Sequence, residues 1–137
     1  MWRKKHIMKK VVKFGGSSLA SAQQFKKVGD IIRSDEARKF VVPSAPGKRF
    51  DSDTKVTDML YQCYAVAQEG KKFDDLLKKI KERYDEIING LGLSLSLEEE
   101  FKVIKEQFKA KAGSDYAASR GEYLNGIIMA NYLGYEF

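Results

Sequence analysis

The segment from Val11 to Ser18, VVKFGGSS, places a β-branched run directly before two glycines and two hydroxyl residues. A short buried strand that ends in a glycine turn and is followed by a helical pattern is the local plan of an α/β protein. At such a junction, glycine lets backbone N–H groups approach an anion, and the helix N-terminus adds partial positive charge. The spacing matches neither the P-loop nor the GxGxxG fingerprint. The residues alone therefore leave two alternatives open: a phosphate-binding loop, or a plain turn with Lys13 in solvent.

The remaining pattern predicts one more strand and then mostly helices. A second strand is expected over 39–42, where Pro43 stops it. The order strand, helix, strand predicts a parallel sheet in an α/β fold. Because two strands and a stub make a small sheet for five helices, we expect the chain to be a fragment of a larger protein. Helical periodicity is expected over 17–34, 56–70, 71–90, 95–113 and 114–134, and a third strand is expected to open at 136–137.

Local signals predict where these helices begin and end. Ser17 or Ser18 is expected to be the N-cap of the first helix. Ser96 stands three residues before Glu99, which is the spacing of a capping box. Gly70 and Gly90 are expected to be C-terminal stops of the second and third helices.

Composition and charge limit the classes of function. The 137 residues are 43% hydrophobic and 32% charged, which is typical of one soluble globular domain, and no apolar run is long enough to span a membrane. The formal charge of +6 comes largely from lysine pairs spread among acids, a pattern typical of solvated helix faces and not of a nucleic-acid patch. With the single cysteine Cys63 no internal disulfide can form, and its apolar helical surroundings predict a packed thiol. No secretory signal follows the basic residues 1–7, which we interpret as a leader or an added remnant. We therefore expect the domain over 8–137 and a cytoplasmic location.

Three segments of this chain together resemble the aspartokinases, within the wider amino-acid kinase family. They are VVKFGGSSL at 11–19, VVPSAPGK with the later VTDML at 41–48 and 56–60, and SRGE at 119–122. The resemblance implies a three-layer αβα sandwich with a mainly parallel sheet, here truncated and helix-rich. In that family the lysine and the glycine backbone hold the ATP phosphates and neutralise charge as the phosphoryl group moves. These roles are thereby implied for Lys13, Gly15, Gly16 and Ser17, with Lys13 as the catalytic residue.

The resemblance also implies a substrate pocket for L-aspartate. Ser44 and Thr57 are expected to line it, and Glu122 is expected to bind the substrate amino group through a charge-assisted hydrogen bond. From the residues alone, each has an ordinary alternative. Ser44 would be a turn residue, Thr57 an N-terminal helix cap, and Glu122 a solvated helix acid.

The implied reaction is phosphoryl transfer from ATP, with Mg²⁺, to the side-chain carboxylate of aspartate, which gives 4-phospho-L-aspartate. This carboxylate has a reference pKa of about 3.9, so it is ionised at neutral pH and needs no general base. The acids that would hold Mg²⁺ cannot be identified from the sequence. Whole aspartokinases continue beyond this length with nucleotide-binding segments and regulatory ACT domains, and the resemblance implies a homo-oligomer. We therefore expect this chain alone to have little or no activity.

Three alternative functions remain open from the sequence. One is another amino-acid kinase, acting on glutamate or on a carbamate, although SRGE and the Ser-Ala segment argue against it. Another is a non-catalytic helical module that binds anions through its lysines. The third is a structural piece that assembles with a partner through exposed sheet edges.

Overall fold

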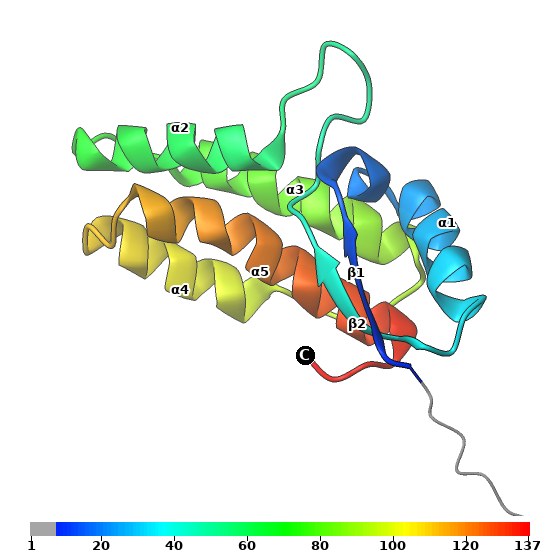
Figure 1. Ribbon diagram of the computed structural model, residues 1–137. Coiled ribbons are helices and arrows are strands. Elements are labelled where there is room, and N and C mark those ends of the chain that lie inside the picture. The colour runs from blue at the N-terminus through cyan, green and yellow to red at the C-terminus, as the bar shows by residue number, and fades with distance from the viewer. Residues whose placement is uncertain (1–7) are drawn as a thin grey trace, which may run out of the picture.

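The computed structural model describes residues 8–137, so the expected leader at 1–7 lies outside the described residues. The chain forms an α/β arrangement in which two strands and α1 lie at one end of a group of four further helices (Figure 1). This confirms the predicted helix-rich α/β class. In order, the elements are β1 (Lys10–Phe14), a 3₁₀ turn η1 (Gly16–Leu19), α1 (Ala22–Arg33), β2 (Arg38–Pro43), α2 (Val56–Gln68), α3 (Asp74–Gly90), α4 (Glu98–Lys109) and α5 (Ser114–Leu133).

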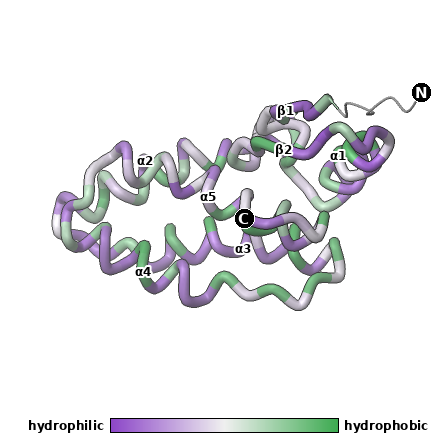
Figure 2. The backbone as a smooth tube through the Cα atoms, turned by 60° about the horizontal axis from the view of Figure 1, so that its bottom comes forward, coloured by the Kyte–Doolittle hydropathy of each residue, from purple (hydrophilic) through white to green (hydrophobic). Residues whose placement is uncertain are grey.

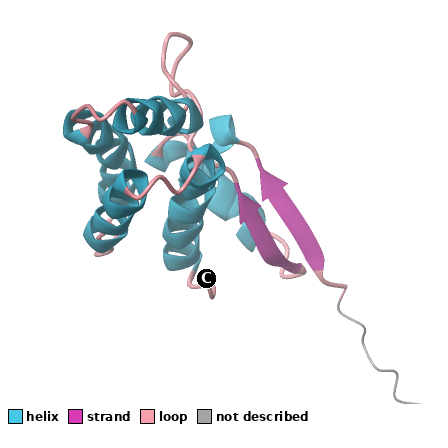
Figure 3. Ribbon diagram, turned by 90° about the vertical axis from the view of Figure 1, so that its left-hand side faces the viewer, coloured by secondary structure: helices cyan, strands magenta, loops and turns pink. Residues whose placement is uncertain are grey.

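The two strands pair in parallel, as the strand–helix–strand order predicts, and α1 connects them (Figure 3). Their side chains alternate between two faces because successive strand residues point to opposite sides. Val12 and Val41 pack against the hydrophobic core. Val11 and Phe40, which are partners in the register, lie on the opposite face and are 68% and 52% exposed. One face of the strand pair therefore positions the core, and the other is largely bare in the described part of the chain.

The expected third strand is wrong for the described residues, because 135–137 have no strand conformation. The chain instead turns back at Gly134, which adopts a left-handed conformation. The Phe137 ring then packs edge-on against Tyr123, with a centroid distance of 5.4 Å. Phe137 thus packs on the apolar surface of α5 and does not form part of a strand.

The core lies between the helices, whose hydropathy alternates along the backbone as amphipathic helices require (Figure 2). Phe108 of α4 is fully buried and contacts the rings of Tyr64, Phe73 and Tyr116. Cys63 is also fully buried, and burial together with the nearby Asp74 charge raises the pKa of its thiol to about 12. The predicted packed thiol is therefore confirmed. Within the helix predicted over 71–90, the apolar residues at helical spacing also face this core: Leu77, Ile80, Tyr84, Ile87 and Ile88 are buried.

Two predicted N-caps are wrong. The first helix begins later than expected because residues 16–19 form the 3₁₀ turn, and Ser21 is the N-cap of α1 in place of Ser17 or Ser18. The Ser21 hydroxyl accepts a hydrogen bond from the Gln24 backbone N–H at 3.3 Å. Thr57 is also not a cap, because α2 begins at Val56 with Lys55 in the capping position.

The other helix ends follow the sequence signals more closely. Gly70, which follows the C-cap residue Glu69 of α2, has a positive φ of 73°, as expected for a glycine stop. At the end of α3 the left-handed residue is Gly92, whereas the expected stop Gly90 still belongs to the helix. Ser96 accepts a hydrogen bond from the N–H of Glu98 at 3.3 Å, so the serine caps locally but without the predicted Glu99 partner.

Two further expectations from the sequence concerned membrane-spanning segments and the exposure of the lysine pairs. No helix within residues 8–137 is both long enough and apolar enough to cross a membrane. The four lysine pairs of the described residues are exposed. Lys26/Lys27 and Lys78/Lys79 lie on the solvated faces of α1 and α3, whereas Lys9/Lys10 lie at the start of β1 and Lys71/Lys72 lie between α2 and α3.

Candidate functional site

A cavity of about 510 Å³ opens where both strands end. Phe14 closes β1 and Pro43 closes β2, and the pocket residues follow directly in each loop. In open α/β sheets this edge, at the carboxyl ends of parallel strands, is where ligands bind. The pocket is lined by Gly16, Ser17, Ser44, Ala45, Pro46, Gly47, Lys48, Lys55, Thr57 and Glu122.

The two loops that follow the strands are held together backbone to backbone. Ser44 donates its N–H to the Phe14 carbonyl at 3.1 Å, and Gly47 donates its N–H to the Gly16 carbonyl at 2.8 Å. A methyl group on Gly47 would lie 2.6 Å from the Gly16 carbonyl carbon and 2.7 Å from the Ser17 nitrogen. Only glycine fits at this approach, so the glycine loop of β1 and the glycine after β2 form one packed floor.

Helix α5 brings Glu122 to this floor. Its neighbour Gly121 packs so tightly that a methyl group there would lie 2.6 Å from the Ala45 side chain. The buried Tyr84 hydroxyl donates to the Gly121 carbonyl at 3.0 Å. One turn further along α5, the fully buried Asn125 donates its side-chain N–H to the Ser44 carbonyl at 2.8 Å. The acid and the serine loop are therefore fixed relative to each other.

Helix α3 supports the same loop through a buried arginine. Arg83 is only 5% exposed, and its guanidinium donates to the Gly47 carbonyl at 2.7 Å and to the Thr54 carbonyl at 2.8 Å. Asp53 lies 3.6 Å from the same group, and burial lowers the pKa of Arg83. The Arg83 side chain thus joins both ends of the 47–54 loop, which projects from the body of the molecule (Figure 1).

The charged residues under this loop predict that the stability of the folded chain falls at acidic pH. Arg49 donates two side-chain hydrogen bonds to Asp53, at 2.7 and 3.1 Å, and these hold the pKa of that carboxyl far below its ordinary value. In the unfolded chain the carboxyl takes up its proton near pH 4, before the folded chain does. The contribution of Asp53 to stability is therefore present above about pH 4 and is lost as the pH falls below that value.

Urea unfolding at pH 6 and at pH 3 measures this loss. We expect the free energy of unfolding of Asp53→Asn to fall less between the two pH values than that of the unsubstituted chain. The exposed Asp51 provides the matched variant Asp51→Asn, which should keep the full dependence. An unchanged dependence in Asp53→Asn would show that this ion pair does not contribute.

Five of the seven residues implied by the resemblance line this one pocket: Gly16, Ser17, Ser44, Thr57 and Glu122. Gly15 precedes the lining residues, with nothing within 4 Å of the position that a side chain would take. Lys13 is exposed on the outer face of β1 and does not line the pocket. The geometry therefore brings the implied substrate residues together, while the phosphate roles of Lys13 and Gly15 stay predictions.

Sequence reasoning missed four residues that build the site: Gly47, Lys48, Lys55 and Arg83. Gly47 and Lys48 stand inside the quoted segment VVPSAPGK, so the missing signal was the packing of that loop on the first one. Arg83 occupies the predicted core stripe of α3, three residues after Ile80 and four before Ile87. A charged residue in an apolar stripe is the signal that would have found it, because buried charges require partners.

The residues present do not form a metal site by themselves. Within residues 8–137, no group of three or more His, Cys, Asp or Glu side chains is placed to hold a metal ion. Glu122 is the one carboxylate among the residues lining the pocket. Since Mg²⁺ needs several oxygen ligands, the described residues do not identify where it would bind.

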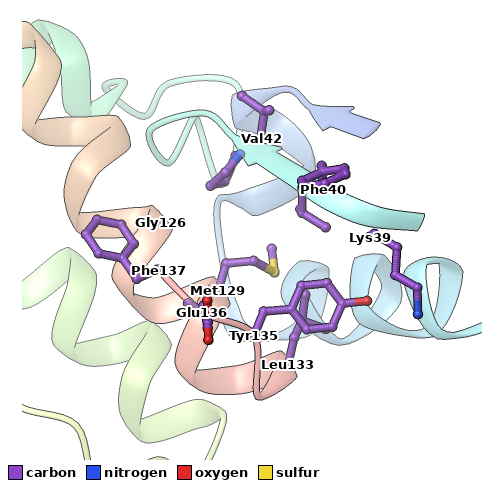
Figure 4. Close-up of a pocket in the computed structure, with 12 residues that line it drawn as sticks. Lys39, Phe40, Val42, Gly126, Met129, Leu133, Tyr135, Glu136 and Phe137 are labelled. Carbon is purple, nitrogen blue, oxygen red and sulfur yellow. The ribbon is translucent and has the colours of Figure 1, made fainter. Parts of the chain in front are cut away.

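A second hollow has a different character. An apolar groove of about 330 Å³ lies between β2 and the end of α5, and it is lined by side chains such as Phe40, Met129 and Phe137 (Figure 4). Lys39 and Glu136 contribute its charges. Its lining includes no serine or threonine, whereas the first pocket has Ser17, Ser44 and Thr57 beside Glu122, so the polar pocket is the candidate functional site.

Comparisons with known proteins identify relatives of this arrangement. The chain is 42% identical over 135 residues to aspartokinase 3 of Bacillus subtilis, a match that covers 93% of this chain and 29% of that protein. The solved aspartate kinase of Clostridium acetobutylicum has a TM-score of 0.87 and 52% identity, over 90% of this chain and 29% of that one. Escherichia coli aspartokinase III in complex with aspartate and ADP has a TM-score of 0.71 and 25% identity, over 90% of this chain and 28% of that one.

These matches confirm the resemblance to aspartokinases that was expected from the three segments. The chain spans less than a third of the length of each of these relatives. The sequence profile of the amino acid kinase family matches residues 8–135, which is nearly all of the chain. The chain therefore belongs to the amino acid kinase family.

Proposed function

We propose that residues 8–137 are a portion of an aspartate kinase catalytic domain and that their polar pocket binds L-aspartate. The observation that carries this proposal is the convergence of Ser44, Thr57 and Glu122 on one cavity at the carboxyl ends of the strands. Its support from outside the chain is the similarity to aspartokinases, one of which was solved with aspartate and ADP.

The proposed chemistry needs little from the pocket beyond position and charge. The side-chain carboxylate of aspartate is ionised at neutral pH and attacks the γ-phosphorus of ATP directly. A new oxygen–phosphorus bond forms, the bond to the bridging oxygen breaks, and its electron pair leaves with ADP. No proton has to be removed, so catalysis rests on orientation and on neutralising the approaching negative charges.

Each residue has a defined part in this proposal. Glu122 accepts a charge-assisted hydrogen bond from the substrate ammonium, and the Ser44 and Thr57 hydroxyls hydrogen-bond its polar groups. The backbone at Gly16 and Ser17 faces the transferred phosphoryl group, and Lys13 supplies positive charge to the phosphates. Mg²⁺, when bound with the nucleotide, would neutralise phosphate charge.

Calorimetric titration of the 137-residue chain with L-aspartate tests the substrate assignment. Binding is the property to measure, because turnover is expected to be slight. We expect Glu122→Gln to bind aspartate about 10-fold to 100-fold more weakly, since a hydrogen bond to a charged group contributes about 1.5–3 kcal/mol. The matched control is Glu36→Gln, which removes the same charge at an exposed residue outside the pocket and should bind normally.

Two results would contradict the proposal. Equal affinity in Glu122→Gln and in the unsubstituted chain would remove Glu122 from the substrate site. Binding of glutamate as tightly as aspartate would favour a different amino-acid kinase. A parallel titration with Mg·ATP, using Lys13→Ala beside Lys27→Ala, separates the kinase proposal from a general anion-binding module, which would lose similar affinity in both variants.

A further inference from the structure

Two lysines on the pocket wall have no assigned partner in the substrate scheme. Lys48 and Lys55 both line the cavity, and both are exposed. Within residues 8–137 neither forms an ion pair, and the Lys48 ammonium has only a long contact of 3.5 Å with the Asp51 carbonyl. The wall therefore carries two positive charges that the protein itself does not neutralise.

Two acids, Asp51 and Asp53, lie between the lysines in sequence, and within the described residues neither forms an ion pair with Lys48 or Lys55. The Asp53 carboxylate accepts two hydrogen bonds from the Arg49 side chain and lies 3.6 Å from Arg83. The backbone N–H of Arg49 also donates to the Asp53 carboxylate at 3.0 Å, which holds this carboxylate on the side of the loop that faces α3. The loop thus directs the Asp53 carboxylate toward α3, and the exposed Asp51 contacts Lys48 only through its backbone carbonyl. Both lysines remain available to the pocket that they line.

The backbone at both lysines is fixed, although their side chains are exposed. Lys48 directly follows Gly47, and Lys55 directly follows Thr54, and these are the two residues whose carbonyls accept from Arg83. The N–H of Val56 also donates to the Pro46 carbonyl at 3.0 Å, and this hydrogen bond closes the base of the 47–54 loop. Because the backbone at both lysines is fixed, their ammonium groups can bind a ligand at a lower cost in conformational entropy than those of lysines on a flexible loop.

We infer that Lys48 and Lys55 form the anion-binding wall of this pocket, placed there by Arg83 and opposite in charge to Glu122. This inference deepens the proposed function, on which it rests for the location of the ligand. The ligand then carries an ammonium group for Glu122 and oxyanion groups for the lysines. The oxyanion is either a carboxylate of the amino acid or a phosphate of the nucleotide, and both use the same charge-assisted hydrogen bonds.

The test is calorimetric titration of the 137-residue chain with two probes, inorganic pyrophosphate and L-aspartate. The variants are Lys48→Ala, Lys55→Ala and the double substitution, and the matched control is the exposed Lys27→Ala on α1. Because both wall lysines are exposed, the variants should fold, and circular dichroism checks this. We expect each single substitution to weaken at least one probe about fivefold or more, and the control to stay within twofold.

The outcomes separate this inference from the proposed function. Weaker pyrophosphate binding alone assigns the wall to phosphate, and weaker aspartate binding alone assigns it to the substrate carboxylate. If pyrophosphate binding depends on the lysines while aspartate does not bind, the wall stands and the aspartate assignment fails. If aspartate binding depends on Glu122 but no lysine variant differs from Lys27→Ala, the wall is overturned and the assignment stands. Absence of binding of both probes to the unsubstituted chain overturns both.

Discussion

Substituting Gly47 by alanine is expected to destabilise the chain by about 3 kcal/mol, the upper part of the usual range for overpacking in a rigid site. The added methyl group would lie 2.6 Å from the Gly16 carbonyl carbon and 2.7 Å from the Ser17 nitrogen. Both contacts are with backbone, which cannot rotate away as a side chain can. The 2.8 Å hydrogen bond from Gly47 to Gly16 would have to lengthen, and the two loops of the pocket floor would separate.

Chemical denaturation followed by circular dichroism measures this loss. The chain offers a matched control in Gly15→Ala, because nothing lies within 4 Å of the new methyl group and the backbone φ of −75° suits alanine. That variant should keep its stability within about 0.5 kcal/mol, as substitutions away from special features do. Equal stability of the Gly47 and Gly15 variants would contradict the close packing of the two loops.

The second large effect is expected at Arg83. Methionine fills much of its volume and removes the cost of burying a guanidinium, but it leaves the buried Gly47 carbonyl without a donor. The Thr54 carbonyl also loses its partner, although it is nearer to solvent. An unsatisfied buried polar group costs about 1–3 kcal/mol, so we expect Arg83→Met to lose about 2 kcal/mol of unfolding free energy in total.

Hydrogen exchange distinguishes a local role of Arg83 from a general loss of stability. The N–H of Val56 donates to the Pro46 carbonyl at the base of the 47–54 loop. In Arg83→Met, we expect this N–H to exchange faster than the decrease in the global free energy of unfolding alone would explain. Arg33→Met is the matched control, because Arg33 is exposed on α1 and bonds to the Tyr132 carbonyl. An Arg83→Met variant as stable as the control would mean that water satisfies the two carbonyls.

The fold class and the helices were predictable because their signals are local. The helix predicted over 114–134 is observed at Ser114–Leu133, between Gly113 and Gly134, both of which have positive φ. The parallel pairing of the two strands followed from their order with one helix between them. The N-cap at Ser21 also has a local signal, because Gln24 follows it at the capping-box spacing. The prediction instead chose Ser17 or Ser18, the hydroxyl residues next to the glycines.

The site was predictable only in part because its remaining members depend on contacts between distant segments. The resemblance identified Ser44, Thr57 and Glu122, and the strand ends explain why they converge. Arg83 reaches Gly47 across 36 residues of sequence, and no local pattern encodes that bond. The expected third strand failed for a similar reason, since the apolar surface of α5 offered Phe137 a contact that its own sequence does not announce.

The most direct test of the proposed substrate site is a nuclear magnetic resonance titration of the chain with L-aspartate, which locates binding residue by residue. We expect saturable shifts of the backbone amides of Ser44, Thr57 and Glu122, and we expect these shifts to be lost in Glu122→Gln. The amides of Phe40 and Met129, in the apolar groove of Figure 4, should not move. Shifts centred on that groove, or no shifts at saturating aspartate in the folded chain, would contradict the claim that the polar pocket is a substrate site.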